Sequence, residues 1–508
     1  PISSRSQKQP RGYFCNLHER LQVLKYVLSV FTCDTSFTRN HLIGKRVTCI
    51  LRNRRYPEPY PLLSRSETSY PDNSDFRPTV TKDGTNEHEK CLPMPINQSI
   101  DVQNIVVIGA GSAGLATSYW LTKKKLDHIV LERGEIANTW INERWDGFHL
   151  VNPNWAVRLP GFHYTGSEPQ GYLSKKSTVE YLQNYAKYFS SPVHDGVGVT
   201  SLRKKDSTYL LNTSKGQNIH ARCVIVATGA FGIPKIPDYA SHLIEPIKQI
   251  HSTEYKNPHA LPHGAVLVVG SGQSGAQISE ELLEAGRKVV LSVGRAGRRP
   301  RRYRGRDSSW WNYAMGSFDK TIDDVESIYE SRFGSSAHTS GTKGGHDIYL
   351  RQMAKKGMKL VGSVTGGSGD NLTLESGLLK TLDQVDNHPI KWKKNVDEYI
   401  EQFGIKVPLD DTIEPQGIER WPGSESPSSF NLTGSAIKTI IWATGFKYDF
   451  DWIKLPVTDE YNFPIQQRGI TEFPGLYFMG LQWMYGSKSA QFIGVGEDAE
   501  HVCRHIAD

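Results

Sequence analysis

The feature that most constrains the fold of this chain is the stretch IVVIGAGSAGLATSYWL at residues 105–121. Residues 105–108 are all apolar and predict a buried strand of a parallel sheet. Gly109, Gly111 and Gly114 follow at the spacing G-x-G-x-x-G. In such a loop the first glycine makes a tight turn, the second lets a pyrophosphate approach, and the third lets helix and strand pack closely. The stretch therefore predicts a loop that cradles phosphates.

The residues after this loop complete a dinucleotide-binding unit. Residues 113–121 are small or apolar and predict a helix whose N-terminus faces the phosphates. A second apolar strand ends at Glu132, where a carboxylate can accept hydrogen bonds from ribose hydroxyl groups. The residues that we expect to bind this dinucleotide are Gly109, Gly111, Ser112, Ala113, Gly114, Glu132 and Arg133.

The same arrangement recurs at residues 265–295. Strands are expected at residues 266–269 and 289–293, with a helix at residues 276–285 between them. This second strand–loop–helix unit predicts a second dinucleotide in the same chain. The loop residues that we expect to bind it are Gly270, Gly272, Gln273, Ser274 and Gly275.

The second unit differs from the first at the end of its second strand, which carries no acidic residue. The strand is followed instead by seven arginines, namely Arg295, Arg298, Arg299, Arg301, Arg302, Arg304 and Arg306. A carboxylate would repel a 2′-phosphate, whereas guanidinium groups bind one bidentately. The second nucleotide is therefore predicted to be NADPH, held by Arg295 and Arg298, which lie closest to the strand. A solvated basic loop is the alternative interpretation of this run.

Three further strands are expected to end in turns that a cofactor approaches. Residues 223–229 and 437–446 each contain a strand followed by Ala-Thr-Gly, and small residues there let a cofactor or a crossing backbone come close. A strand at residues 476–479 precedes a loop and a terminal helix, whose positive N-terminus near Gly494 is expected beside an electron-rich ring carbonyl. The residues expected at these turns are Ala227, Thr228, Gly229, Ala443, Thr444, Gly445 and Gly480.

The loop at residues 134–162 clusters aromatic and polar side chains directly after the first site. Core packing and contact with a cofactor ring are both open for Trp140, Trp145 and Trp155. We expect Trp140, Arg144 and Trp145 to contribute to the binding of the ring.

Other segments predict structural elements. Residues 177–189 predict a helix that begins with the capping box Ser177…Glu180. Residues 310–316 predict a helix over a pocket, and the turn that holds His346 predicts a capping or packing histidine.

The order of these units predicts the fold class, which is α/β with two Rossmann-like dinucleotide-binding domains and a largely disordered N-terminal extension. Because an apolar strand of the first unit returns at the C-terminus, we expect the NADPH domain to be inserted into a domain that binds FAD. The expected boundaries are residues 1–100 for a disordered or targeting-like extension, 101–240 for the first part of the FAD-binding domain, 241–433 for the NADPH-binding domain with a pocket-forming insert, and 434–508 for the C-terminal part of the FAD-binding domain.

The N-terminal extension differs in composition from the rest of the chain. Residues 1–66 hold twelve Lys or Arg and three acidic residues, and residues 56–84 are rich in Pro, Ser and charge. Disorder, a transit peptide and a small folded accessory segment remain open for this region.

Composition narrows the class of protein and its partners. The net charge of +7, from 60 basic and 53 acidic residues, is too modest for 508 residues to argue for nucleic acid. None of the six cysteines forms a C-x-x-C motif, and no cluster has metal-ligand spacing. No window approaches the roughly 18 apolar residues of a membrane span. We expect a small-molecule substrate and a cytoplasmic location, or an organelle if the extension is a transit peptide; a homodimer is left open.

From about residue 101 onward the chain resembles the class B flavin-dependent monooxygenases, which include microsomal-type and plant auxin-pathway enzymes, and more closely their soluble microbial relatives. The resemblance rests on both glycine loops, both Ala-Thr-Gly segments and PGLYFMGL at residues 474–481. Of the family motif F-x-G-x-x-x-H-x-x-x-F/W/Y, this chain keeps His251 and Tyr255 but has Glu245 and Ile247 at the Phe and Gly positions. This departure argues against a Baeyer–Villiger enzyme and leaves a structural role for His251 open.

The resemblance implies an NADPH-dependent FAD monooxygenase. In such enzymes NADPH reduces FAD, O₂ adds to give a C4a-hydroperoxyflavin, and one oxygen atom passes to a small soft nucleophile such as an amine, a thioether or a carbonyl compound. The protein supplies binding, orientation and a dry pocket. The family often uses an asparagine near the flavin, so Asn152 and Asn154 are the candidate catalytic residues.

Three alternatives share these motifs. A disulfide reductase has the same layout but needs a pair of cysteines beside the flavin. An NADPH oxidase or electron-transfer reductase would release peroxide or pass on electrons without oxygenating a substrate. A non-enzymatic flavoprotein that senses redox state is the third.

Overall fold

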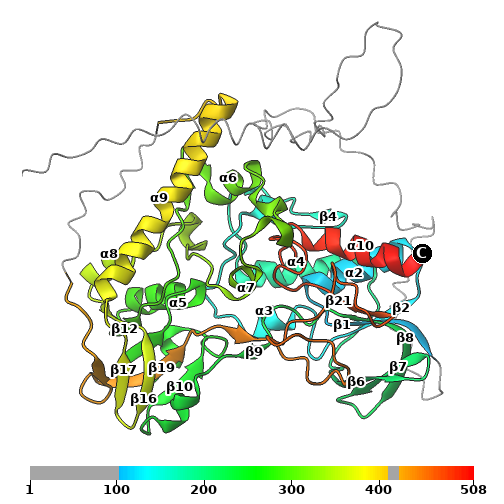
Figure 1. Cartoon of the computed structure of the whole chain (residues 1–508), viewed down its shortest axis with the longest axis horizontal. Coiled ribbons are helices and arrows are strands. Elements are labelled where there is room, and N and C mark those ends of the chain that lie inside the picture. The colour runs from blue at the N-terminus through cyan, green and yellow to red at the C-terminus, as the bar shows by residue number, and fades with distance from the viewer. Residues whose placement is uncertain (1–101, 410–422) are drawn as a thin grey trace, which may run out of the picture. The chain divides into compact units, whose positions relative to one another are not determined.

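The computed structural model describes residues 102–409 and 423–508 (Figure 1). The predictions for the extension at residues 1–100 lie outside the described residues. Two sheets built mainly from parallel strands organise the described chain, and each carries one of the two glycine loops.

The first sheet has seven strands in the order β5-β2-β1-β8-β7-β6, and β21 also pairs with β8. β1, β2, β5, β8 and β21 run parallel, whereas β6 and β7 form an antiparallel hairpin on β8. The strands are β1 (Gln103–Ile108), β2 (His128–Leu131), β5 (Val193–His194), β6 (Val199–Lys205), β7 (Thr208–Thr213), β8 (Asn218–Val226) and β21 (Leu476–Phe478).

The second sheet has five parallel strands in the order β10-β19-β11-β12-β15. They are β10 (Lys248–His251), β11 (Ala265–Val269), β12 (Val289–Ser292), β15 (Lys359–Val361) and β19 (Ile437–Trp442). All five lie in the sequence between β8 and β21, so the second Rossmann-like unit is inserted in the first. The predicted fold class is confirmed for the described residues.

Two short strands mark where the chain leaves the first unit and returns to it. β9 (Ile233–Pro234) follows the first Ala-Thr-Gly turn, and β20 (Phe446–Lys447) follows the second. The two strands pair antiparallel, and Lys235 N–H donates to the Gly445 carbonyl oxygen at 2.9 Å. The pairing therefore holds the two Ala-Thr-Gly turns close to one another.

The strand registers bring each glycine loop to the carboxyl edge of its sheet. Ile108 lies opposite Leu131 on one side and Val226 on the other. Val269 likewise lies between Ser292 and Trp442. Because the carboxyl ends of parallel strands share one edge, each glycine loop lies beside an Ala-Thr-Gly turn.

Helices cover both sheets. α2 and α10 pack against one another on the first sheet, and α5 lies against the second (Figure 1). The helices with the first sheet are α2 (Ser112–Lys123), α3 (Asn138–Asn142), α4 (Lys175–Tyr188) and α10 (Val495–Ala507). Those between β8 and β21 are α5 (Gln273–Glu284), α6 (Ser308–Ala314), α7 (Ile328–Phe333), α8 (Leu350–Lys355) and α9 (Leu378–Phe403).

The predicted start of α4 is wrong by three residues. The helix begins at Lys175, and the Ser174 side chain accepts a hydrogen bond from the Ser177 backbone N–H at 3.2 Å. Ser177 is therefore inside the first turn rather than at the cap. A serine three residues before another serine offers two equivalent cap positions, and the sequence pattern alone selected the later one.

Small sheets complete the described chain. β16, β17 and β18 form an antiparallel sheet next to the second unit. The bounds of the remaining strands are β3 (Arg158–Leu159), β4 (Phe162–His163), β13 (Arg302–Tyr303), β14 (Arg306–Asp307), β16 (Val364–Ser368), β17 (Asn371–Leu374) and β18 (Ser429–Asn431).

The core lies on the faces of the two sheets. One cluster buries Val107 and Ile225 completely between α2, α4 and α10. The second sheet is buried on both faces, because Val268 belongs to one cluster and Leu267 to another. Burial on both faces is why the central strands are apolar runs rather than alternating patterns.

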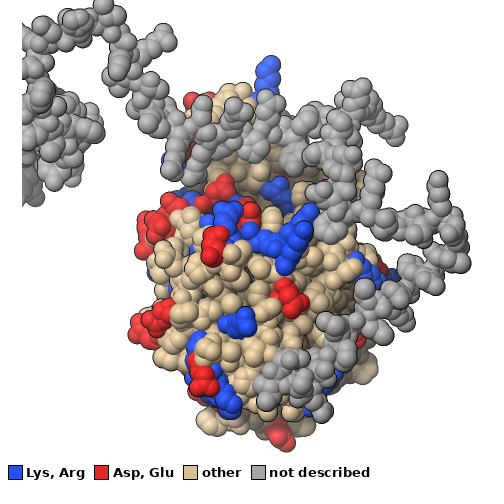
Figure 2. Space-filling view, turned by 90° about the vertical axis from the view of Figure 1, so that its right-hand side faces the viewer, with Lys and Arg blue, Asp and Glu red and all other residues tan. Residues whose placement is uncertain are grey.

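Charged side chains on the face shown in Figure 2 are of both signs, with uncharged surface between them. This distribution agrees with the modest net charge and gives that face no broad basic surface. No helix among residues 102–409 and 423–508 is long and apolar enough to cross a membrane.

Candidate functional site

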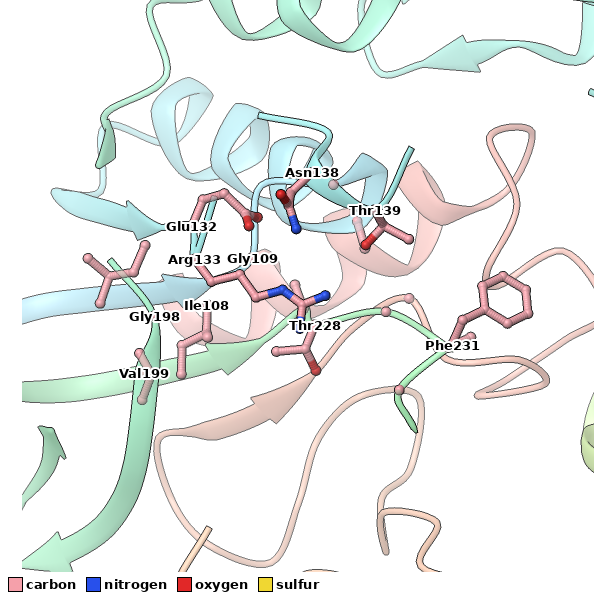
Figure 3. A pocket seen from close by; sticks show the side chains of 18 of the residues that line it. Ile108, Gly109, Glu132, Arg133, Asn138, Thr139, Gly198, Val199, Thr228 and Phe231 are labelled. Carbon is pink, nitrogen blue, oxygen red and sulfur yellow. The ribbon is translucent and has the colours of Figure 1, made fainter. Parts of the chain in front are cut away.

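A cavity of about 410 Å³ lies at the carboxyl edge of the first sheet (Figure 3). It is lined by most of the residues predicted for the first site and for the aromatic loop. The predicted residues that line it are Gly109, Gly111, Ser112, Ala113, Glu132, Arg133, Trp140, Arg144, Ala227, Thr228, Gly229 and Gly480.

The first loop has a shape that requires glycine. Gly109 has a φ of +107°, and a Cβ there would lie 2.5 Å from the carbonyl oxygen of Ala227. A Cβ on Gly114 would overlap the carbonyl oxygen of Gly109. A Cβ on Gly111, in contrast, would meet nothing within 4 Å, and Gly111 lines the cavity. The loop therefore fits a pyrophosphate, because its backbone is bare on the side that a phosphate approaches.

The carboxylate at the end of β2 is held in place by backbone groups. Glu132 is almost fully buried, and its side chain accepts hydrogen bonds from the N–H of Ala110 at 2.8 Å and of Gly134 at 3.1 Å. The neighbouring Arg133 is exposed and pairs with Glu143 at 2.7 Å. Both side chains line the cavity in Figure 3, so this end of it suits a ribose and its base.

Arg144 brings a positive charge into an aromatic part of the cavity. Its guanidinium lies 5.5 Å from the ring centre of Trp140, 5.9 Å from Phe148 and 5.3 Å from Phe231. Burial lowers the pKa of Arg144 from its ordinary value. A guanidinium among aromatic rings suits a flat conjugated ligand that carries negative charge.

The second glycine loop repeats the geometry of the first. Gly270 has a φ of +103°, and a Cβ there would lie 2.6 Å from the carbonyl oxygen of Ala443. A Cβ on Gly275 would overlap the carbonyl oxygen of Gly270, whereas one on Gly272 would meet nothing within 4 Å. The Gln273 side chain, in the first turn of α5, donates to the carbonyl oxygen of Thr339. This loop therefore fits a second pyrophosphate.

The two arginines predicted for the second site have different surroundings. The Arg295 side chain is 84% exposed and lies 3.8 Å from Glu375. Arg298 is buried, with its guanidinium 2.8 Å from Asp347 and 4.0 Å from the ring centre of Tyr349. Arg295 is open to a phosphate in solution, whereas Arg298 is directed towards a carboxylate of its own chain.

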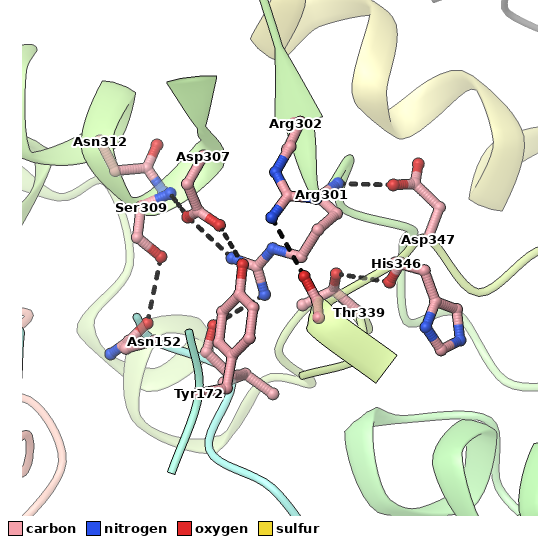
Figure 4. A network of polar contacts seen from close by, with 12 residues as sticks. Asn152, Tyr172, Arg301, Arg302, Asp307, Ser309, Asn312, Thr339, His346 and Asp347 are labelled. Atoms are coloured by element: carbon pink, nitrogen blue, oxygen red, sulfur yellow. Dashed lines mark hydrogen bonds and ion pairs between the residues drawn. The ribbon is translucent and has the colours of Figure 1, made fainter. Parts of the chain in front are cut away.

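Asn152 and Asn154 differ in what they contact. Asn152 donates to the Gln491 side chain at 2.9 Å and accepts from the Ser309 hydroxyl at 3.3 Å (Figure 4). It therefore links the first unit to α6, and Gln491 follows Ala490, which lines the cavity. Asn154 is buried and donates to the Glu168 carbonyl oxygen at 2.9 Å.

Trp145, His251 and His346 are among the predicted residues that do not line the 410 Å³ cavity. Trp145 is buried and lines a separate hollow of about 150 Å³ beside Glu281. His251 is fully buried, with its Nε2 hydrogen-bonded to the Gly445 carbonyl oxygen at 3.1 Å, which supports a structural role. His346 contacts the Glu280 carboxylate at 2.9 Å, and this hydrogen bond raises its pKa.

Part of the cavity lining was not found from the sequence. Val197, Gly198, Val199 and Thr200 reach it from the segment at the start of β6. No motif distinguishes these residues, since pairing in the sheet alone brings them there. Of the other missed residues, Phe231 had a signal, because it follows the Ala-Thr-Gly turn by two positions. Asn138, Thr139 and Trp452 had none.

Comparisons with known proteins agree with this arrangement. Residues 106–311 match the family model described as "Pyridine nucleotide-disulphide oxidoreductase". An uncharacterized CzcO-like oxidoreductase of Geobacillus kaustophilus is 33% identical over 80% of this chain and 98% of its own length. This chain belongs to the CzcO-like oxidoreductases.

More distant relatives of this CzcO-like chain are named as monooxygenases. The probable indole-3-pyruvate monooxygenase YUCCA1 of Arabidopsis thaliana is 31% identical over 37% of this chain and 48% of its own length. The flavin-containing monooxygenase of Stenotrophomonas maltophilia has a similar fold, with a TM-score of 0.54 and 20% identity over 80% of this chain and 98% of that one. The CzcO-like chain thus has the fold of a flavin-containing monooxygenase, and part of its sequence resembles an indole-3-pyruvate monooxygenase.

Proposed function

We propose that this CzcO-like oxidoreductase is an NADPH-dependent FAD monooxygenase that transfers one oxygen atom to a small soft nucleophile. FAD is assigned to the 410 Å³ cavity and NADPH to the loop at Gly270. Bound FAD would supply the redox chemistry, by accepting hydride from NADPH and activating O₂. The protein would bind and orient the two cofactors and keep water away from the reacting groups.

The observation that best supports this proposal is that the glycine loop occurs twice in the chain, with the same geometry. Two loops of the same shape end the central strands of two sheets, and each faces an Ala-Thr-Gly turn. The pairing of β9 with β20 holds these turns close together. Two dinucleotides bound there would be directed towards one another, as hydride transfer between them requires.

The two glycine loops decide which parts of the chain we assign to each cofactor. Residues 101–240 and 434–508 are assigned to FAD binding, and residues 241–433 to NADPH binding and the pocket-forming insert. The C-terminal return through β21 favours FAD at the first site, because two separate parts of the chain then enclose the larger cofactor.

In the first cavity, Glu132 and the backbone at Gly111 would hold the adenosine and the pyrophosphate. Trp140 and Arg144 would hold the flavin ring. A guanidinium beside the ring would favour electron transfer to it, since a fixed positive charge stabilises the negative charge of the reduced form. The aromatic side chains around Arg144 would give the ring apolar surroundings, which the oxygen chemistry requires.

At the second loop, Gly272 leaves the backbone open for a pyrophosphate, and Arg295 is placed for the 2′-phosphate. Asn152, held between Ser309 and Gln491, is the better placed of the two asparagines to contact the reacting groups. It lies where the two units meet, next to the lining of the first cavity.

The described cysteines support oxygen transfer over disulfide reduction. Cys503 is buried in α10, with its Sγ 3.6 Å from the carbonyl oxygen of Thr117. Cys223 is in β8, and neither cysteine lines the first cavity. The relatives named as indole-3-pyruvate monooxygenases favour a substrate with a carbonyl group, and amines and thioethers complete the proposed class.

The test is the fate of molecular oxygen. The FAD-loaded enzyme is mixed with NADPH, ¹⁸O₂ and, in turn, small amines, thioethers and carbonyl compounds, with NADH as the matched control. We expect at least one compound to gain a single ¹⁸O atom, with NADPH consumed in proportion and a slower reaction with NADH. Recovery of all NADPH equivalents as hydrogen peroxide with every compound would instead identify an NADPH oxidase.

A further inference from the structure

Arg298, Arg299 and Arg301 lie in the segment between β12 and α6, and their surroundings differ. Arg298 lies 2.8 Å from Asp347, and Arg301 lies 2.8 Å from Asp307. The side chains of both arginines are only 2% exposed. Each of these buried guanidinium groups therefore has a carboxylate partner, as burial of a charge requires.

Arg299 lies between them in the sequence and has no such partner among residues 102–409 and 423–508. Its backbone N–H donates to the His338 carbonyl oxygen at 3.0 Å, but its side chain forms no hydrogen bond or ion pair with a described residue. The Nε atom is buried without a hydrogen-bond acceptor. Burial, together with the positive charge of Arg301, lowers the pKa of Arg299 to about 10.

The nearby carboxylates are already engaged by other donors. Asp307 accepts hydrogen bonds from Arg301, from the Tyr172 hydroxyl at 2.6 Å and from the Ser309 N–H at 2.6 Å (Figure 4). Asp347 accepts from Arg298 and from the Arg301 N–H. Arg299 is thus a partly exposed cation whose Nε is buried without an acceptor, and the acids that contact Arg298 and Arg301 serve other donors. An anion that reaches this guanidinium would supply the missing partner.

The position of Arg299 points to the junction of the two units rather than to the outer end of β12. Arg301, Asp307 and Tyr172 all influence the pKa of Arg299, and Tyr172 comes from the first unit. Arg301 also donates to the carbonyl oxygen of Val151 at 2.8 Å, next to Asn152. The exposed Arg295 remains the arginine placed for a nucleotide phosphate.

We propose that Arg299 is the receptor for an oxyanion at the junction of the two units, and that this oxyanion is the carboxylate of an acidic substrate. The inference rests on the proposed function, because it narrows the substrate class of the same site. A guanidinium pairs with a carboxylate through two parallel hydrogen bonds, which orients a small acid as well as holding it. A phosphate of the dinucleotide offers the same chemistry and is separated from a substrate carboxylate by the test below.

The test measures binding to the oxidised, FAD-loaded enzyme by calorimetry. The probes are phenylacetate and 3-(methylthio)propionate, each compared with its neutral amide. We expect at least one acid to bind wild type about tenfold or more tighter than its amide, since a charged pair with two hydrogen bonds is stronger than a neutral hydrogen bond. Arg299→Leu should abolish this preference and Arg299→Lys should retain part of it. Arg306→Leu, a variant of an exposed arginine in the same loop, should keep it in full.

Three results of the binding measurements would overturn the proposal. One is the absence of any acid preference in wild type, and another is a preference that survives in Arg299→Leu. The third is weaker binding of NADP⁺ but not of NAD⁺ in Arg299→Leu, which would assign Arg299 to the nucleotide phosphate instead.

Thermal unfolding separates a receptor from a structural arginine. Arg299→Leu should unfold at the same temperature as wild type or a few degrees higher, because it removes a charge that has no partner among the described residues. Arg301→Leu should unfold several degrees lower, because it leaves the buried Asp307 carboxylate without its guanidinium partner. A drop for Arg299→Leu as large as that for Arg301→Leu would overturn the proposal. Binding to the oxidised enzyme needs no oxygen transfer, so a failed ¹⁸O experiment and a failed acid preference are distinct results.

Discussion

Asn152 and Asn154 are two positions apart and have opposite environments. Asn152 joins Ser309 to Gln491 where the two units meet, whereas Asn154 is buried and bonded to the backbone of Glu168. We predict that Asn152→Ala increases the hydrogen peroxide released per NADPH severalfold, because a polar contact at the junction is lost. Asn154→Ala should leave this ratio unchanged but lower the free energy of unfolding by about 1–3 kcal/mol. Unchanged peroxide release in Asn152→Ala would remove this residue from the site.

His338 makes a prediction about pH. It is fully buried beside the second glycine loop, and burial, with the charge of Arg298, lowers its pKa from 6.5 to about 4. Between these values the unfolded chain binds more protons than the folded one, so the stability from neutral His338 is complete above pH 6.5 and is lost as the pH falls towards 4.

The magnitude at pH 5 is about 2 kcal/mol for this one residue. Urea unfolding of wild type and His338→Asn at pH 7 and pH 5 measures it. His338→Asn should lose about 2 kcal/mol less than wild type when the pH is lowered. Equal losses in the two proteins would show that His338 is not the titrating group.

Single residues were predictable from the sequence where their role is local. Gly109, Gly114 and Glu132 have their functions set by neighbours in the same strand–loop–helix unit. The environment of Arg298 was not predictable, because its partner Asp347 comes from a distant segment. From the sequence, the run of arginines predicts one basic loop. Only the folded chain separates the arginines that pair with a carboxylate from those that do not.

At the scale of elements, the N-terminus of α4 gives a measurable correction. Ser174 rather than Ser177 accepts the hydrogen bond that caps this helix. Ser174→Ala should therefore lower the free energy of unfolding by about 1 kcal/mol, as the loss of a serine cap does. Ser177→Ala should cost clearly less, and the reverse order in a thermal or urea unfolding series would restore the original prediction.

The strands were easier to predict than the helices of the insert. Residues 105–108, 224–226, 265–269 and 440–442 are apolar runs because helices or loops cover both faces of their sheets. The long helix α9 was missed, since Pro389 inside it is a signal that normally ends a helix. Its start also has a glycine at the cap rather than a capping side chain.

At the scale of the whole molecule, the insertion of one Rossmann-like unit into another followed from the order of the motifs. The cavity lining did not follow completely, because Val199 and Thr200 reach it only through the pairing of the sheet. The contacts of Asp307 are the least local part, since Tyr172 and Arg301 reach it from separate segments of the chain.

The central claim is that the first glycine loop binds FAD and the second binds NADPH, which reduces that FAD. Gly111→Ala and Gly272→Ala test it as a pair, because a methyl group at either position meets no protein atom within 4 Å and obstructs only an approaching phosphate. The measurement is FAD content after purification, followed by the anaerobic rate of flavin bleaching against NADPH concentration.

We predict that Gly111→Ala folds but loses FAD. Gly272→Ala should keep FAD and need at least about tenfold more NADPH for half-maximal bleaching, a loss of about 1.4 kcal/mol or more in binding. Loss of FAD from Gly272→Ala with retention in Gly111→Ala, or wild-type bleaching in Gly272→Ala, would contradict the assignment.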